Sequence, residues 1–509
     1  MTGPSEYRST PTKFSPRILA LLCYLLVGCL CSSAADLKKE RAEIEGSLAS
    51  FQLAAAEQLI SKMSDRGYQK FYACNLLMYK FFATQDAEYI QQVRSIWKAT
   101  LATVETIPED DPLKYVLLSE LYCKRSALEF LDQNYLTSIR LARTGRVMIR
   151  RNQHRHADNV EQLKILGIMN IVLGAVPAKY QWITHSLGFK GNLQQGLKQL
   201  ETAATQSSLL KLEAQLILGF VEKNILDRPN EALSRLQALQ LEYGGNLVID
   251  YFLATALLGM KKSNEALEIL SQRNKYLEEE VFFAPFWDYQ LGKAYYFKND
   301  LRNAQRYLAR FIKAYKGKLA RTDAHFRLGM ALTLNNSYEL GQQFFKSIAT
   351  GELSDLDEDA YAQFMATKFL ENKPGKYVMA LFRARNYFDG GFHEQAALEL
   401  ANIKDAYGIL SPAQRIEFHY RQARILHAQG EVELATEQYE KCIAQPEVEE
   451  SKWLQAYAWF YQASISRDQG FLEQAKQQYK KALEFDGYFY QSGLENRCKA
   501  SLSELKQAG

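Results

Sequence analysis

The fold is decided by Leu291-Gly-Lys-Ala-Tyr295 leading to Ala304-Gln-Arg-Tyr-Leu308, and by Trp459-Phe-Tyr-Gln-Ala463 leading to Ala475-Lys-Gln-Gln-Tyr479. In both stretches two small residues stand 12 positions apart, and a large apolar residue follows four positions after the second. Two helices can cross closely only where the side chains at the crossing are small. The spacing therefore predicts pairs of helices joined by short turns, with a small residue on each helix where the two touch.

The same two small positions recur four more times along the chain, at Ala254/Ala266, Gly329/Gly341, Ala384/Ala396 and Ala423/Ala435. Successive second members lie 38, 37, 55, 39 and 40 residues apart. This pattern resembles the tetratricopeptide repeat, whose consensus period is about 34 residues. The resemblance implies an all-α fold, namely a tetratricopeptide-repeat α-solenoid of stacked antiparallel helix pairs.

The spacing and quality of the repeats predict the domain organisation. Residues 201–350 are expected to hold tetratricopeptide repeats, and residues 377–509 further repeats and a C-terminal helix. The longest interval falls over residues 351–376, where we expect an insertion or hinge with an extra helix. Residues 36–200 have helical periodicity but a poor repeat pattern, so they are predicted to form degenerate helical hairpins with a Pro/Gly elbow.

The elbow is the most specific stretch of the N-terminal half. It resembles the signature of the eukaryotic family that includes the inclusion-body clearance protein and the tetratricopeptide-repeat protein thirty-nine group, although that signature has Ser where Gly174 stands. The resemblance implies a helical scaffold without known catalysis, here in a bacterial exported form. From the residues alone, a structural elbow and a ligand-binding turn both stay open. The matching positions are Gly167, Pro177, Gly188, Phe189, Gly191, Asn192, Gly196 and Leu197.

The N-terminus predicts the compartment. Residues 1–35 hold a basic stretch, an apolar run of about 14 residues and a small-residue exit, as in a secretory signal peptide. The apolar run is shorter than the roughly 20 residues of a spanning helix. Leu26-Val-Gly-Cys29 resembles a lipobox, which would make Cys29 the lipid attachment site, whereas Ser33-Ala-Ala35 resembles an ordinary signal-peptidase exit. A third alternative is that the segment stays uncleaved as a short anchor. If the source is bacterial, all three alternatives place the remaining chain outside the cytoplasm, as an exported envelope protein that is an outer-membrane lipoprotein or periplasmic.

Motifs that would carry chemistry are missing from the sequence. We find no P-loop, GxSxG, HExxH or dinucleotide fingerprint. The balance of 62 basic and 58 acidic residues does not favour nucleic acid as a partner. Cysteines after the N-terminal segment stand singly, so buried thiols are favoured, while a bridge between Cys74 and Cys123 stays open. We therefore expect no enzymatic activity, no cofactor and no metal site.

Two surfaces are candidates for partner binding. Aromatic and basic residues on the first helix of each pair can line a concave groove for a peptide or helix. A basic stripe formed by Arg143, Arg146 and Arg150 shares one helix face and could meet anionic lipid or an acidic partner, or could be a solvated face. The predicted groove residues are Tyr289, Arg327, Arg383, Tyr387, Arg421 and Tyr461.

These observations predict a non-catalytic interaction scaffold of the cell envelope. It would bind partner proteins or peptides through the helical-repeat groove, with a lipid anchor as an additional membrane contact. The alternative is a solute- or glycan-binding outer-membrane lipoprotein, a class that also builds on tetratricopeptide helices.

Overall fold

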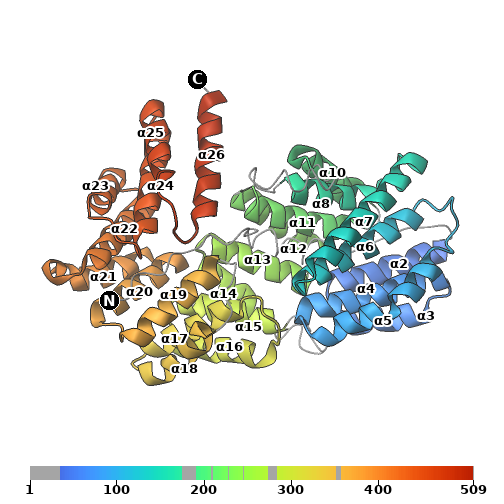
Figure 1. The fold of residues 1–509 in the computed structure, drawn as a ribbon, viewed down its shortest axis with the longest axis horizontal. Coiled ribbons are helices and arrows are strands. Elements are labelled where there is room, and N and C mark those ends of the chain that lie inside the picture. The colour runs from blue at the N-terminus through green and yellow to red at the C-terminus, as the bar shows by residue number, and fades with distance from the viewer. Residues whose placement is uncertain are drawn as a thin grey trace. The chain divides into compact units, whose positions relative to one another are not determined.

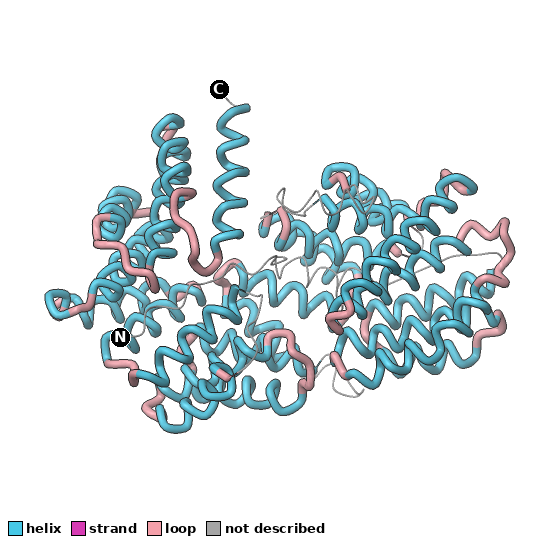
Figure 2. The backbone as a smooth tube through the Cα atoms, in the orientation of Figure 1, coloured by secondary structure: helices cyan, strands magenta, loops and turns pink. Residues whose placement is uncertain are grey.

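The computed structural model describes residues 35–174, 191–207, 210–226, 228–244, 246–272, 284–350 and 357–507. Within these ranges all regular structure is helical, with 24 α-helices, one short 3-10 helix and no strand (Figures 1 and 2). No helix of the described ranges is both long enough and apolar enough to cross a membrane. The prediction of an all-α fold is confirmed.

The chain divides into two compact units, which we call the N-terminal unit (described residues up to Leu239) and the C-terminal unit (described residues from Gln240 on). In the N-terminal unit α2 pairs with α3, α4 with α5, α6 with α7, and α8 with α10, while α11 packs on α10. The helices are α2 (Ala35–Ala49), α3 (Leu53–Lys62), α4 (Arg66–Thr84), α5 (Ala87–Val104), α6 (Lys114–Leu131), α7 (Tyr135–Arg155), α8 (Gln162–Gly174), α10 (Leu193–Gln206), α11 (Lys211–Asn224) and α12 (Pro229–Glu242), which runs across the division.

The C-terminal unit contains six consecutive helix pairs, α13·α14, α15·α16, α17·α18, α20·α21, α22·α23 and α24·α25, with α19 and α26 as single helices. Its elements are α13 (Leu247–Gly259), α14 (Ser263–Ser271), α15 (Ala284–Phe297), α16 (Leu301–Ala314), α17 (Arg321–Leu334), α18 (Tyr338–Ala349), α19 (Asp357–Glu371), α20 (Lys376–Gly390), α21 (His393–Lys404), η2 (Tyr407–Ile409), α22 (Pro412–Gln429), α23 (Val432–Ile443), α24 (Lys452–Asp468), α25 (Leu472–Ala482) and α26 (Gln491–Gln507).

These six pairs are the six repeats predicted from the small residues. Each predicted alanine is fully buried, with one small position on each helix of its pair. In α17·α18 a Cβ atom on Gly341 would lie 2.6 Å from the carbonyl oxygen of Gly329, so this crossing is too close for any side chain. The fold of the C-terminal unit is therefore a tetratricopeptide-type α-solenoid, as the spacing predicted.

The single helix α19 changes how the later pairs stack. It packs against both α17 and α18, and after it α20 packs against α15, which belongs to the second helix pair before α20·α21. The turn between α15 and α16 joins this contact, because Asn299 donates to the carbonyl of Arg383 (3.0 Å) and accepts from the side chain of Asn386 (2.9 Å). The extra helix expected between residues 351 and 376 thus exists, and it brings distant pairs together.

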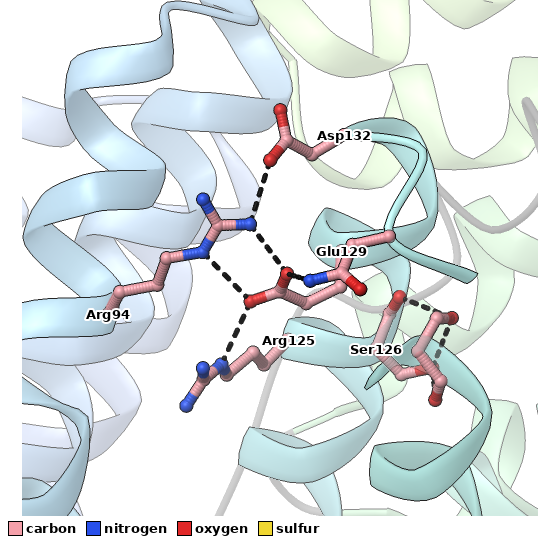
Figure 3. Close-up of polar contacts among 7 residues, drawn as sticks. Arg94, Arg125, Ser126, Glu129 and Asp132 are labelled. Atoms are coloured by element: carbon pink, nitrogen blue, oxygen red, sulfur yellow. Dashed lines mark hydrogen bonds and ion pairs between the residues drawn. The ribbon is translucent and has the colours of Figure 1, made fainter. Parts of the chain in front are cut away.

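Ion pairs connect neighbouring helix pairs of the N-terminal unit. Figure 3 shows Arg94 of α5 reaching Glu129, at 2.6 Å, and Asp132, at 2.7 Å, near the end of α6. Arg125 approaches the same Glu129 carboxylate from within α6. Burial alone would raise the pKa of Glu129, but the two arginines outweigh it and hold this pKa below its ordinary value. The contact fixes α5 against the next pair.

The glycines of the elbow signature lie at the crossing of α8 and α10. A Cβ atom on Gly167 would lie 2.9 Å from the carbonyl oxygen of Gly196, and one on Gly196 would lie 2.8 Å from the carbonyl oxygen of Gly167. Asn192 caps α10 through a bond from the backbone N–H of Gln195 at 2.9 Å. These contacts support the structural interpretation of the stretch, while Pro177, Gly188, Phe189 and the predicted lipid attachment site Cys29 lie outside the described residues.

Candidate functional site

A pocket opens among α15, α17, α19 and α20 of the C-terminal unit, and we call it the α15–α20 pocket. It measures about 510 Å³ including its open mouth. It lies where α20 packs against α15, beside the single helix α19. Its wall combines aromatic rings with charged and amide side chains, namely Tyr296, Phe297, Asp323, Phe326, Arg327, Glu358, Tyr361, Ala362, Phe382, Arg385, Asn386, Asp389 and Tyr490.

Arg327 is held rigidly on one side of this pocket. Its Nε lies 2.6 Å from Oδ2 of Asp323, which also accepts from the hydroxyl of Tyr289 at 2.7 Å. The guanidinium lies over the rings of Tyr296 and Phe297, at 5.4 and 5.2 Å from their centroids. Burial alone would raise the pKa of Asp323, but Arg327 outweighs it and lowers this pKa, so the pair stays ionised.

Arg385 of α20 also lines the pocket and is less completely paired than Arg327. Its Nη1 donates to the hydroxyl of Tyr361 at 2.7 Å, and its Nε lies 3.7 Å from Asp389. A guanidinium carries five N–H donors. Among the described residues, Tyr361 is its one hydrogen-bond acceptor, so Arg385 keeps donors for another group.

Carboxylates complete the polar lining, and an amine that is not part of the lining lies close to them. Glu358 is exposed at the start of α19, and Asp389 is partly exposed at the end of α20. Lys293 of α15 lies close enough to these groups to feel their charge, and burial together with Arg327 lowers its pKa. Fixed charges of both signs beside aromatic rings can bind a peptide, whose backbone offers both donors and acceptors.

The predicted groove residues do not all face this pocket. Arg327 lines it, and Tyr289 lies behind Asp323 with an exposed fraction of 8%. Arg383 instead pairs with Glu399 of α21 at 3.0 Å. Tyr387 packs against Phe392 after α20, with ring centroids 6.2 Å apart.

The remaining two predicted residues lie further along the array. Arg421 of α22 is buried and pairs with Glu417 at 3.0 Å. The ring of Tyr461 on α24 stacks on Tyr439, at 6.0 Å, and lies 3.6 Å from the guanidinium carbon of Arg424. These residues form a second group, separate from the lining of the α15–α20 pocket.

Sequence reasoning did not name Arg385, because it selected Arg383 on the other face of α20. Successive helical residues are rotated by about 100°, so Arg383 and Arg385 point about 200° apart. A usable signal was present, because a cation directly follows the small crossing residue in three pairs: Lys293, Arg385 and Arg424.

The predicted basic stripe borders a different pocket, in the N-terminal unit. Arg146 and Arg150 line it together with amide side chains from α8 and α10, and it measures about 890 Å³ including its open mouth. Asn170 donates to Gln199 across the two helices at 2.8 Å. Arg143 is exposed near the middle of α7. Burial and the adjacent Arg150 lower the pKa of Arg146, so positive charge is concentrated here.

The cysteines of the described chain are free and buried. Burial raises the pKa of Cys74 and of Cys123 to about 12. The thiolate is the nucleophilic form of cysteine, so at neutral pH these side chains are inert packing groups. Within the described ranges, no cluster of His, Cys, Asp and Glu is arranged to hold a metal ion.

Comparison with known proteins yields a distant structural match. No family model matches the chain. No curated protein matches it either. One matching solved structure is the "Crystal structure of APC/C hetero-tetramer Cut9-Hcn1", at 10% identity and a TM-score of 0.29, covering 96% of this chain and 92% of that chain. A likeness this distant assigns neither a family nor a function, which must be argued from the chain's own geometry.

Proposed function

We propose that this chain is a non-catalytic scaffold that holds a partner protein by binding one of its peptide segments in the α15–α20 pocket. The observation that carries the proposal is the pocket's lining, in which immobilised charges of both signs stand beside aromatic rings. Repeat proteins of this kind commonly bind extended peptides on the face formed by the first helix of each pair. In this chain α15, α17 and α20 are such first helices.

The lining provides specific roles for a bound peptide. Arg385 has donors left for a peptide carbonyl or side-chain oxygen. Asp389 and Glu358 can accept from peptide N–H groups, and the ring of Tyr361 offers an apolar contact. Because Arg327 is already fixed by Asp323, binding costs little side-chain entropy on that side of the pocket.

A peptide display selection tests this proposal. Peptides from a random library that bind the full chain should lose affinity by about tenfold or more, or about 1.4 kcal/mol, in Arg385→Gln. Arg383→Gln is the matched control, since it removes the same charge from the same helix but on the face that pairs with Glu399. Affinities are measured by calorimetry, and circular dichroism verifies that both variants fold.

Two results would contradict the proposal. Equal weakening in Arg385→Gln and Arg383→Gln would mean that the pocket does not select the peptides. If no peptide is enriched but a neutral glycan raises the melting temperature saturably, the solute-binding alternative replaces the scaffold.

The cellular location is part of the proposal. We place the scaffold in a bacterial cell envelope, as a distant exported relative of the inclusion-body clearance and tetratricopeptide-repeat protein thirty-nine family. Support comes from the signal-like residues 1–35 and from the glycine-rich elbow signature.

The proposed location can be tested through acylation of Cys29. In a bacterial host, Cys29→Ser should abolish lipid labelling and release the chain from membranes, while Cys31→Ser should leave both unchanged. Mass spectrometry of the mature N-terminus measures the result. A mature chain that begins at Asp36 would identify ordinary signal cleavage instead.

A further inference from the structure

A second group of cations lies in the C-terminal unit where the turn between α13 and α14 meets α20. Lys261 occupies this turn with a φ of 61°, and its carbonyl oxygen lies so close to Gly391 that no side chain fits there. Its Nζ is 3.1 Å from the ring centroid of Phe388 on α20. The turn therefore places an ammonium group directly on an aromatic face.

Arg424 of α22 approaches the same ring. Its guanidinium carbon lies 5.2 Å from the centroid of Phe388 and 3.6 Å from that of Tyr461. Phe388 thus contacts both cations, and Tyr461 supports Arg424. Both cations are partly buried, so neither is a freely solvated surface charge. We call Lys261, Phe388, Arg424 and Tyr461 the cation cluster.

The charges of the cation cluster are not neutralised by the described chain. No described carboxylate lies within 4.0 Å of Nζ of Lys261 or of the guanidinium of Arg424. The Nε of Arg424 is buried and has no hydrogen-bond acceptor, and Nε2 of the nearby His393 is also buried without a partner. Neighbouring Arg421, in contrast, is paired with Glu417. Buried donors without acceptors are costly, and native structures seldom leave them so.

The electrostatics of nearby groups agree with excess positive charge. Burial first, and then Arg424, lower the pKa of Lys261 to about 7. Burial, followed by Lys261 and Arg424, also lowers the pKa of His393. Asp389 opposes the shift of Lys261 but does not cancel it. A bound anion would favour the protonated form of both groups.

We infer that Lys261 and Arg424 form a binding site for an oxyanion, a carboxylate or a phosphate group, carried by the partner peptide. That the oxyanion belongs to a peptide rests on the proposed function, whereas the site itself rests on the cation cluster. Arg424 supplies guanidinium N–H groups as charge-assisted donors, and Lys261 supplies the ammonium. Asp389 lies near Lys261 and also lines the α15–α20 pocket, so one peptide can reach both places.

Calorimetry with small anions tests the site on the full chain. Sulfate and capped tetraglutamate should bind saturably, whereas capped tetraglutamine should not. Arg424→Gln and Lys261→Gln should each weaken binding by about tenfold or more. Arg415→Gln, on the same helix, and Lys262→Gln, the next residue along the turn, remove equal charge and should change affinity by less than about twofold, well below the tenfold step of 1.4 kcal/mol.

A third probe identifies the source of the oxyanion. A capped phosphoserine peptide that binds at least about tenfold more tightly than tetraglutamate would indicate a phosphorylated partner, and the reverse order an acidic one. The site is overturned if no anion binds saturably, or if the control variants weaken binding as much as Arg424→Gln. Neutral peptides selected on the α15–α20 pocket should keep their affinity in Arg424→Gln, so the two proposals fail separately.

Sulfate affinity should also depend on pH. A bound anion favours the charged ammonium, so affinity is greatest below pH 7 and falls as pH rises through about 7 and Lys261 loses its proton. The groups that face Lys261 are Asp389, His393, Arg421, Arg424 and His427, and the lowered pKa values of His393 and His427 keep both rings neutral in that range. Sulfate does not titrate there. A pH slope that survives in Lys261→Gln would refute this assignment.

Discussion

Replacing Lys164 with methionine should destabilise the N-terminal unit by about 3–5 kcal/mol. Its Nζ lies 2.5 Å from Oε1 of Glu120 and 3.0 Å from Oε2 of Glu213, joining α8 to α6 and α11. The side chains of Lys164 and Glu120 are each only 1% exposed. Lys124, which bonds Asn75 of α4 at 2.8 Å and Glu120 at 3.1 Å, would then face two buried carboxylates alone. Removing one partner leaves a buried charge without compensation, which is why the loss is large.

Urea denaturation followed by circular dichroism measures this loss. The chain has two units, so the transition that shifts must be assigned to the N-terminal unit, for instance by limited proteolysis along the titration. Lys476→Met is the control, because Lys476 pairs with an exposed Glu473 on α25 and such pairs contribute about 0–1 kcal/mol.

A second substitution tests the electrostatic origin of the effect. Burial raises the pKa of Glu213, so its ionised form is already disfavoured. Lys164→Met combined with Glu213→Met should therefore recover part of the stability lost in Lys164→Met, a non-additive result typical of residues in contact. Strictly additive losses would mean that packing, not charge, dominates at this position.

The repeats of the C-terminal unit could be predicted because they depend on local spacing. Ala304, Ala396 and Ala435 follow their partners by 12 residues, and that offset sets where two helices joined by a short turn must cross. Such information lies within about 40 residues of chain, the length of one repeat. The groove was harder to predict, because a shift of two positions along α20 determines whether an arginine contacts α21, as Arg383 does, or lines the pocket, as Arg385 does.

Features that depend on distant segments could not be predicted. The approach of α20 to α15 requires α19 and the contact of Asn299 with Asn386, 87 residues apart. Lys164 and the three charged residues around it come from α6, α8 and α11, and nothing in the spacing of single lysines and glutamates marks them as buried. Lys261 contacts Phe388 because the turn between α13 and α14 packs against the end of α20, which is distant in the sequence. The α15–α20 pocket and the cation cluster are therefore tertiary features.

The second large effect is expected for the elbow glycines. Here the sign of the change in stability distinguishes a close helix crossing from ordinary helix propensity. Gly196→Ala would stabilise α10 by up to about 1 kcal/mol if helix propensity alone mattered. The added methyl would instead lie 2.8 Å from the backbone oxygen of Gly167 and 2.8 Å from the backbone N of Ile171. Backbone atoms cannot rotate away as side chains do, so α8 and α10 must separate. We expect a loss of about 1–3 kcal/mol, and more for Gly196→Val.

Gly46→Ala is the matched control, since Gly46 is also helical and a Cβ atom there would meet nothing within 4 Å. Urea titrations of the two variants should shift in opposite directions, with Gly46→Ala neutral or more stable than the parent chain. Gly167→Ala should behave like Gly196→Ala, and the double variant should cost less than the sum, because the first change already separates the helices. If Gly196→Ala is stabilising, the close crossing of α8 and α10 is not what these glycines serve. The ligand-binding interpretation of the elbow would then be the one to pursue.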